Sequence, residues 1–284
     1  MKFDVIIVNY CSHQPLKQSL SSLLRYNEPN LSKVYVIDNS PDGVPKSIKT
    51  AFPKVIFQEN FKNLGFAKGV NQALNLSKAP YLCLLNPDTE IKGLLLQQFH
   101  SFFQKHPRAG VVGPLILESD GSVQGSARSF PRIATAFFGR TTLLSRLLPN
   151  NPISKKEVIK DFHGKEPIKV DWVSGACMGI RSEAVKDVGL LDERFFLYWE
   201  DCDWCTRFRQ KGWDVFYLPT AGPVVHHTGL ASKHAKWLSN YHFHRSAWLL
   251  YNKYDTSPGK IMSMIALAGA FLRFSMVSLK LMWR

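Results

Sequence analysis

The chain has 284 residues, 45% of them hydrophobic, which predicts a globular protein with one large domain and an appendage, or with two small domains. Its formal net charge is +14, but charge alone indicates only nonspecific attraction and does not identify a nucleic-acid-binding protein. The chain has an odd number of scattered cysteines, and the segment after Met1 is strand-like and does not resemble a signal peptide. Both features predict a cytosolic location.

The first 85 residues alternate between apolar runs and segments with leucines or alanines at helical spacing. We predict strands at residues 3–8, 34–37, 55–57 and 81–85, and helices at 15–26 and 67–76. This alternation predicts an α/β fold with a Rossmann-like, doubly wound, mainly parallel sheet, in which ligands bind at the carboxyl ends of the strands. Asp38 and Asp88 both follow predicted strands.

Residues 63–71 place two glycines and two asparagines at the start of a predicted helix. Free backbone N–H groups there favour a phosphate, although a glycine turn with an asparagine cap explains the same pattern. Asp88 follows Pro87 at a strand end, where it either binds a divalent cation or caps the next helix.

Residues 118–169 are rich in Gly, Ser, Pro and basic residues and are interpreted as a mobile connection with short helices, with apolar patches at 133–138 and 143–148. Regular structure is predicted to return at 170–173 and to include a strand at 212–217.

Residues 199–204 place three carboxylates between tryptophans in a basic chain. On a helix, Asp203 lies four residues before Arg207, which favours an ion pair, whereas Asp201 has no such partner. Asp201 is therefore the candidate general base and Glu200 the alternative; the acids can also simply stabilise a helix N-terminus. Cys202 and Cys205 form a CxxC, but without a second one we do not favour a zinc site.

Residues 233–284 hold eight Lys or Arg against one acid, Asp255. The apolar segment 261–283 is interrupted by Arg273 after a dozen residues, short of the roughly 18 that a membrane-spanning helix needs. We therefore predict a basic amphipathic helix that lies on an anionic membrane surface; packing on its own domain or on a second subunit is the alternative.

Motifs at residues 5–10, 36–40, 63–71, 85–89, 175–178 and 189–203 together resemble glycosyltransferase family 2, closest to its rhamnosyltransferase-like branch, over roughly residues 3–255. The resemblance implies a GT-A fold and inverting transfer of a sugar from a nucleotide-diphosphate sugar to an acceptor hydroxyl. It implies a donor linked to dTDP or UDP that carries rhamnose or a related hexose, and a lipid-linked glycan acceptor in cell-surface polysaccharide synthesis.

The resemblance also implies roles for single residues, with Mg²⁺ or Mn²⁺ as cofactor. Asn86 replaces the first acid of the family's metal motif, so that few protein ligands are expected, and His226 matches the late histidine better than His227 does. The implied donor-binding residues are Asn9, Asp38, Asn63, Gly65, Phe66, Asn71, Asn86 and Asp88; the metal ligands are Asp88 and His226; the catalytic acids are Asp201 and Glu200; and the candidate acceptor-binding residues are Trp172, Gly175 and Trp199. Tryptophans such as Trp172, Trp199 and Trp204 can form a sugar platform, although such residues are more often core.

We thus expect a glycosyltransferase domain at 1–255, with a nucleotide-sugar half at 1–117 and an acceptor half at 118–255, followed by a helical tail at 256–284 that can also pair two subunits. The expected location is the cytoplasmic face of the cell membrane, with peripheral attachment. A catalytically silent sugar-nucleotide-binding scaffold is one alternative. A sugar nucleotidyltransferase is another, but residues 8–12 lack its glycine- and arginine-rich triphosphate loop.

Overall fold

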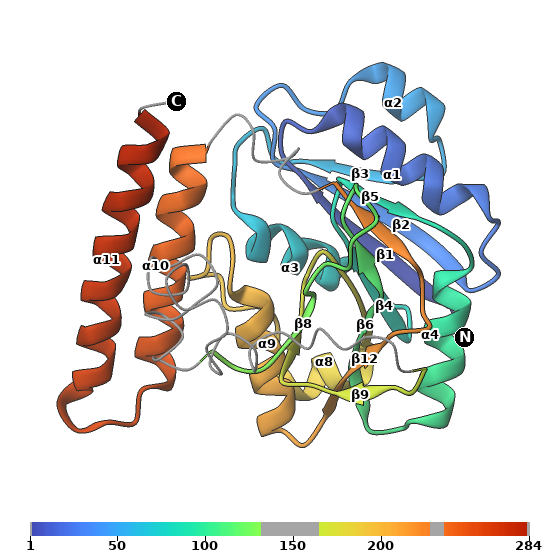
Figure 1. The fold of residues 1–284 in the computed structure, drawn as a ribbon. Coiled ribbons are helices and arrows are strands. Elements are labelled where there is room, and N and C mark those ends of the chain that lie inside the picture. Colours follow the sequence, from blue (N-terminus) through green and yellow to red (C-terminus); the bar gives the residue numbers. More distant parts are fainter. Residues whose placement is uncertain (1, 132–164, 228–235, 283–284) are drawn as a thin grey trace.

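A computed structural model of the protein describes residues 2–131, 165–227 and 236–282. Its centre is an eight-stranded sheet in the order β3-β2-β1-β4-β11-β6-β12-β9, with helices on both faces (Figure 1). The pairs β3–β2, β2–β1, β1–β4 and β6–β12 are parallel. The predicted α/β fold with a mainly parallel sheet is therefore confirmed.

The first half of the chain follows the predicted alternation of strands and helices. Its elements are β1 (Phe3–Asn9), α1 (His13–Arg25), β2 (Leu31–Asp38), α2 (Lys46–Ala51), β3 (Ile56–Glu59), α3 (Phe66–Leu76) and β4 (Tyr81–Leu85). Every residue of β1 and β4 is buried, which explains why these strands are continuous apolar runs without polar alternation.

The second half departs from parallel winding. β11 (Cys177–Arg181) enters the sheet antiparallel between β4 and β6 (Ala109–Pro114). β12 (Asp214–Leu218) confirms the strand predicted at 212–217 and pairs with β6 and with the short β9 (Ile168–Lys169). The segment predicted at 170–173 forms only β10 (Trp172–Val173), which pairs with β8 (Ala127–Arg128) outside the main sheet.

A separate three-stranded sheet joins segments that are far apart in the sequence. β13 (Val224–His226) lies between β5 (Thr89–Ile91), to which it is antiparallel, and β7 (Ile116–Leu117), to which it is parallel. These strands follow β12, β4 and β6 along the chain. The small sheet therefore gathers the segments that leave three strands of the main sheet.

Two hydrophobic cores hold the helices on the main sheet. α1, α2 and α4 (Leu95–Lys105) pack on one face, and α3, α8 (Ser182–Val188) and α9 (Glu200–Gln210) pack on the other. Alternate residues of β1 serve different cores: Val5 and Ile7 contact the first, whereas Ile6 and Val8 contact the second. The sheet is thus covered on both faces, and its strand ends are left for a ligand.

The chain ends in a helical hairpin of α10 (Lys236–Tyr254), η2 (Pro258–Lys260) and α11 (Ile261–Met282). α10 and α11 stand side by side at one edge of the molecule, with α11 outermost (Figure 1). Leu250 of α10 is buried in the second core, and the Phe274 ring of α11 packs against Trp237 and Tyr241 of α10. The predicted helical appendage is confirmed, and the domain boundary after residue 255 stays a prediction.

The expectation that Arg273 makes the last helix too short to span a membrane is wrong. The helix Pro258–Ser278, of 21 residues, is long and apolar enough to cross a membrane by length and composition alone. The Arg273 guanidinium lies over the Phe243 ring of α10, 5.6 Å from its centroid, so the charge does not interrupt the outer face of the hairpin. The exposed apolar residues of α11 are Ile261, Met262, Met264, Ile265, Leu267, Phe271, Leu272 and Met276.

Two sequence interpretations lie outside the described residues. The apolar patches at 133–138 and 143–148 fall within residues 132–164, and the end of the histidine segment falls within residues 228–235.

Candidate active site

Asn9 and Asp38 stand at the carboxyl ends of the neighbouring strands β1 and β2. Asn9 Nδ2 donates to Asp38 Oδ1 over 2.6 Å, and Ser40 donates to the same carboxylate from its hydroxyl, at 2.9 Å, and from its backbone N–H, at 3.2 Å. Asp38 is fully buried among these contacts. The two residues therefore fix the strand ends, and their contact with a donor stays a prediction.

The glycine loop begins α3 at Phe66, close to the predicted helix start. Asn63 Oδ1 accepts the Gly65 backbone N–H over 3.0 Å, and Asn39 Nδ2 donates to the Gly65 carbonyl over 3.1 Å. The Phe66 N–H donates to the carbonyl of Phe196 over 2.7 Å. The loop is thus attached to the segment that precedes Glu200 and Asp201.

Asn71 binds the same segment from inside α3. Its Nδ2 donates to the Leu191 carbonyl and to Glu193 Oε1, each over 3.0 Å, and its Oδ1 accepts the Leu191 N–H. The Asn71 side chain is buried and fully engaged in these bonds. The structure therefore gives Asn71 a role in positioning the loop, and its contact with a donor stays a prediction.

Replacing Gly65 with alanine is expected to weaken donor binding. Gly65 has a φ of +85°, and a Cβ there would lie 2.6 Å from the Phe196 carbonyl oxygen. Strain at a residue of this kind costs about 1–3 kcal/mol, and relieving the clash moves the two loops apart. We expect Gly65→Ala to lower the unfolding temperature and to weaken binding of the nucleotide sugar, measured by calorimetric titration.

Gly189 supplies the matched control for this substitution. Its φ of +87° imposes the same backbone strain, but among the described residues no neighbouring atom lies within 4 Å of the position that a Cβ would take. Gly189→Ala should therefore lose stability without losing donor affinity. Equal donor affinity in Gly65→Ala and Gly189→Ala would contradict the coupling of the two loops.

Asp88 and His226 meet at the junction of the main and small sheets. Asp88 Oδ1 lies 3.2 Å from His226 Nε2, and the two side chains are 4% and 13% exposed. None of the described residues donates a hydrogen bond to Asp88 Oδ1. A buried carboxylate oxygen beside an imidazole nitrogen fits a hard divalent cation, which takes its remaining ligands from water and phosphate.

The geometry distinguishes the two adjacent histidines. His227 Nε2 lies 3.9 Å from Glu90 Oε2 and its Nδ1 lies 2.8 Å from the Ser119 hydroxyl, so both of its ring nitrogens contact side chains other than Asp88. Asn86 Nδ2 lies 3.5 Å from His226 Nε2. Within the described residues no three His, Cys, Asp or Glu side chains form a metal cluster, so a cation here would have few protein ligands.

Glu200 and Asp201 begin α9 and differ in their surroundings. Burial, and then the charge of Asp201, raise the pKa of Glu200 well above its ordinary value, and its buried Oε2 has no hydrogen-bond partner in the described parts of the chain. Burial also raises the pKa of Asp201, but its carboxylate accepts backbone N–H groups of Gly175, at 2.9 Å, and Cys202, at 2.8 Å. These bonds favour the charged form of Asp201, whereas Glu200 lacks them; the role of Asp201 as general base stays a prediction.

Backbone contacts bring the Asp88 and Asp201 segments together. The Asn86 N–H donates to the Ala176 carbonyl over 2.9 Å, and the adjacent Gly175 N–H binds Asp201. A Cβ on Gly175 would lie 3.5 Å from Asp201 Cβ and 3.9 Å from the Phe66 ring. The glycine loop, which ends at Phe66, therefore also reaches Gly175.

Tyr198 reports the same proximity electrostatically. Its pKa is raised first by burial, and the nearby Glu200 and Asp88 carboxyl groups raise it further in their charged forms. The two carboxylate groups that the sequence predicts at one site therefore act on a common neighbour.

The aromatic candidates divide into core and site residues. Trp204 is fully buried and donates to the Gly189 carbonyl, which makes it a core residue. Trp172 is 7% exposed and donates to the Ser129 carbonyl, and its ring centroid lies 6.1 Å from that of Trp199. Trp199 immediately precedes Glu200, and no described residue accepts a hydrogen bond from its buried Nε1. An acceptor contact by Trp172 or Trp199 stays a prediction.

Sequence reasoning missed three residues of this region. Arg128 lies over the Trp172 ring at 5.2 Å and lowers the pKa of Asp201 by its charge. Gln124 Oε1 lies 3.0 Å from His226 Nδ1. Phe243 of α10 packs against the Trp199 ring. Arg128 and Gln124 lie in the Gly- and Ser-rich segment interpreted as a mobile connection, where no periodic pattern marks them.

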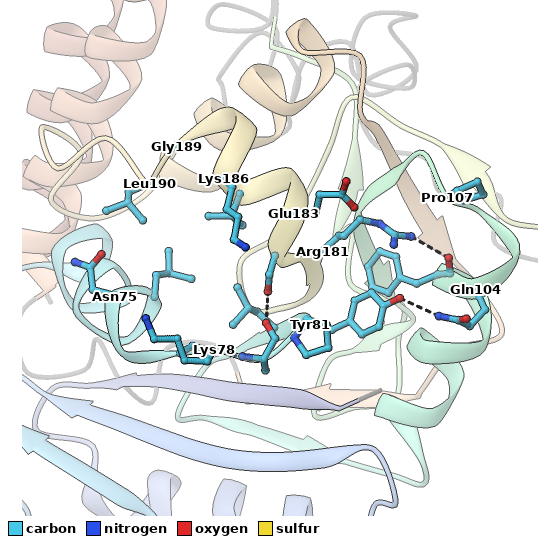
Figure 2. Close-up of a pocket in the computed structure, with 18 residues that line it drawn as sticks. Asn75, Lys78, Tyr81, Gln104, Pro107, Arg181, Glu183, Lys186, Gly189 and Leu190 are labelled. Atoms are coloured by element: carbon cyan, nitrogen blue, oxygen red, sulfur yellow. Dashed lines mark hydrogen bonds between the residues drawn. The ribbon is translucent and has the colours of Figure 1, made fainter.

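Two cavities lie near β4 but at opposite ends of it. One, of about 1040 Å³, is lined by residues such as Lys78, Tyr81 and Arg181 (Figure 2). Because Tyr81 begins β4, this cavity is at the amino end of the strand, away from the site. The other, of about 600 Å³, has Asp88 and His227 in its wall.

Comparison with known proteins agrees with this geometry. A family model described as glycosyl transferase family 2 matches residues 4–189. The chain is 31% identical to an N-acetylglucosaminyl-diphospho-decaprenol L-rhamnosyltransferase of Mycobacterium tuberculosis over 234 residues, which cover 78% of this chain and 75% of the relative. It is 22% identical to the dTDP-rhamnosyl transferase RfbF of Shigella flexneri, over 79% of this chain and 68% of the relative.

Among solved structures, the chain is similar to GalNAc-T7 with UDP, GalNAc and Mn²⁺, with a TM-score of 0.57 and 15% identity. That match covers 95% of this chain and 54% of the other, so the chain spans about half its length. At this identity the likeness shows the fold alone. The chain belongs to glycosyltransferase family 2 and has the GT-A fold.

Proposed function

We propose that this glycosyltransferase moves rhamnose, or a related hexose, from a dTDP- or UDP-linked donor to a hydroxyl of a lipid-linked glycan, with inversion. The activities named for the two rhamnosyltransferase relatives support the sugar and the acceptor class. The observation that carries the proposal is the convergence of Phe66, Asp201 and the Asn86–Asp88 turn at Gly175 and Ala176, where Asn86 provides the contact. A scaffold without activity has no use for an ionised base beside a cation site.

The proposed reaction is an in-line displacement at the anomeric carbon. Asp201 accepts the proton of the acceptor hydroxyl, whose oxygen forms a bond to that carbon as the bond to the diphosphate oxygen breaks. The two backbone N–H groups on Asp201 hold its carboxylate in place for this transfer. Glu200 stays protonated and so does not compete for the proton.

The leaving diphosphate is placed by the residues around Asp88. Asp88 and His226 would hold Mg²⁺ or Mn²⁺, which when bound offsets the negative charge that grows on the diphosphate. The start of α3, after Gly65, directs backbone N–H groups toward an anion. We propose that Asn9, Asp38 and Asn63 lie near the bound nucleotide. Asn9 and Asp38 fix the ends of β1 and β2, and Asn63 fixes the glycine loop.

A direct test is transfer from a panel of nucleotide sugars to a lipid-linked acceptor, with Mg²⁺, with Mn²⁺ and with a chelator. We expect product from a nucleotide rhamnose and a divalent cation, and a marked loss with the chelator. Donor binding without transfer or hydrolysis under all these conditions would favour the silent scaffold.

The proposed location is the cytoplasmic face of the cell membrane. The five cysteines are all free thiols, which suits a reducing compartment. The outer face of α11 is apolar and exposed, and residues 233–284 are strongly basic, so an anionic bilayer is the partner whose chemistry fits both features. A lipid-linked acceptor would be presented at the same surface.

Replacing Phe271 with serine should weaken membrane binding. Phe271 is 67% exposed on α11, and burying a phenylalanine in an apolar phase is worth about 1.5–3 kcal/mol, or about tenfold or more in partitioning. The measurement is sedimentation with anionic vesicles at low and high salt. Phe61, 62% exposed and outside the hairpin, is the matched control, and Phe61→Ser should bind as the wild type does.

Two outcomes would count against this location. Wild-type protein that stays in the supernatant with anionic vesicles at low salt would contradict it. A wild-type dimer that Phe271→Ser converts to a monomer would show that a second subunit covers the α11 face instead.

A further inference from the structure

A short chain of hydrogen bonds ends at Nδ1 of His226, the ring nitrogen that does not face Asp88. It begins at Glu118, which follows β7, and passes through Gln124, which lies at the end of the next turn. Gln124 Nε2 donates to Glu118 Oε1 over 2.8 Å, and Gln124 Oε1 lies 3.0 Å from His226 Nδ1. Neither Glu118 nor Gln124 has a part in the function proposed above.

The direction of each bond in this chain follows from chemistry. An ionised carboxylate only accepts hydrogen bonds, so Glu118 must face the NH₂ group of the Gln124 amide. The amide oxygen then faces His226, and because it too only accepts, Nδ1 of the imidazole must donate. In a neutral histidine the proton is therefore on Nδ1 and the lone pair is on Nε2.

The lone pair of Nε2 is directed at the site. Nε2 lies 3.2 Å from Asp88 Oδ1, so two electron-pair donors face each other in a largely buried place. The Asn86 amide, at 3.5 Å, also presents its NH₂ group to Nε2, as expected when that nitrogen accepts. The tautomer set by Gln124 is the one that can ligate a cation together with Asp88.

The small sheet gives this chain a firm support. The Gln124 N–H donates to the Ile116 carbonyl over 2.9 Å, and Leu117 and Val123 form a β-bridge across the turn. β7 pairs in turn with β13, the strand that ends at His226. The positions of Gln124 and His226 are thus linked through backbone hydrogen bonds, which a side chain on a loose loop would lack.

We propose that Gln124, oriented by Glu118, is a positioning residue that fixes His226 in the tautomer with its Nε2 lone pair toward Asp88. The consequence for cation binding rests on the proposed function. The consequence for the tautomer does not, because the chain of bonds exists in the protein alone. Partners of this kind behind a metal ligand typically change metal affinity by about 10–100-fold when removed.

The experiment combines a spectroscopic and a binding measurement on the full-length protein. Nitrogen-15 NMR of histidine-labelled, metal-free protein at mildly alkaline pH, with the His226 signals assigned by their loss in His226→Gln, reports which ring nitrogen carries the proton. We expect Nδ1–H in the wild type and Nε2–H or a mixture in Gln124→Leu. Mn²⁺ titration followed by EPR should show affinity about 10–100-fold weaker in Gln124→Leu.

Two further variants protect the test against simple misfolding. The double variant Glu118→Gln, Gln124→Glu exchanges the amide and the carboxylate but keeps an oxygen acceptor facing Nδ1. Unlike Gln124→Leu, it should keep both the wild-type tautomer and the wild-type Mn²⁺ affinity. Ser119→Ala removes a 2.8 Å contact with His227 Nδ1 in the same turn and should change neither.

The outcomes separate this inference from the proposed function. An Nε2–H tautomer in the wild type, an unchanged tautomer in Gln124→Leu, or failure of the double variant to keep the wild-type tautomer would overturn the role of Gln124. If the tautomer changes as expected but the wild type binds no Mn²⁺ or Mg²⁺, the positioning role stands and the proposed cation site fails.

Discussion

Asp201→Asn is expected to retain the donor and lose transfer. The substitution keeps the size of the side chain and one of the two oxygens that accept the backbone N–H groups of Gly175 and Cys202, but it removes the base. A general base typically contributes about 10²–10⁴ in rate, so kcat should fall by that factor while nucleotide-sugar affinity changes little. Steady-state kinetics and calorimetric titration of the donor provide the two measurements.

Glu200→Gln is the matched control for this prediction. Because we propose that Glu200 is protonated, glutamine would replace a neutral group with another neutral group, and kcat should stay within about tenfold of the wild type. A Glu200→Gln enzyme that is inactive beside an active Asp201→Asn enzyme would exchange the roles of the two acids.

The pH dependence of the wild type checks the same assignment. Burial raises the pKa of Asp201 above its ordinary value of 3.8, so the folded state binds this proton more tightly than the unfolded state does. The cost of the charged form begins as the pH passes 3.8 and is complete above the raised pKa. Asp201→Asn removes this cost but gives up one backbone hydrogen bond, so its stability at neutral pH should stay within about 1 kcal/mol of the wild type. The acid limb of kcat/KM should lie above pH 3.8 and be absent from the residual activity of Asp201→Asn.

Asp203→Ala should strongly destabilise the fold. Asp203 is fully buried in α9 and accepts bonds from Arg207 at 2.9 Å, Lys253 at 2.6 Å and the Tyr254 hydroxyl at 2.8 Å. Removing the acid takes the carboxylate partner from the largely buried Arg207 and one of two partners from Lys253, which keeps Asp192 at 2.8 Å; breaking a buried pair typically costs about 3–5 kcal/mol. Urea unfolding of the two proteins at neutral pH measures the difference in free energy of unfolding.

Two comparisons separate the charge from the loss of packing. Tyr254→Phe removes only one hydroxyl and should cost about 1 kcal/mol. Adding Arg207→Met to Asp203→Ala removes the cation whose carboxylate partner is gone and should recover part of the loss. A loss below about 1 kcal/mol in Asp203→Ala would mean that the network does not hold α9 against α10.

The features that sequence predicts well here are local ones. The continuous apolar runs of β1 and β4 reflect burial on both faces, and the ion pair of Asp203 with Arg207 follows from helical spacing alone. The place of Asp88 at a strand end could likewise be predicted, because parallel strands direct their carboxyl ends to one edge.

The features that sequence does not reveal depend on contacts between distant segments. β11 carries Gly179, where a Cβ would lie 2.6 Å from the Phe99 side chain of α4. This close packing requires a glycine, and a glycine does not show the β-branched or aromatic pattern by which a strand is predicted from sequence. Asn71 resembles a helix-start residue but binds Leu191, 120 positions away. The choice of His226 over His227 depends on the register of β13 beside β5, which no local pattern fixes.

The central claim is a single displacement in which Asp201 activates the acceptor hydroxyl against a donor held near Asp88 and His226. The one-bond carbon–proton coupling at the anomeric carbon, measured by NMR on the first product formed from a nucleotide rhamnose, reports its anomeric configuration most directly. We expect a configuration opposite to that of the donor. Retention of the donor configuration would contradict the single displacement.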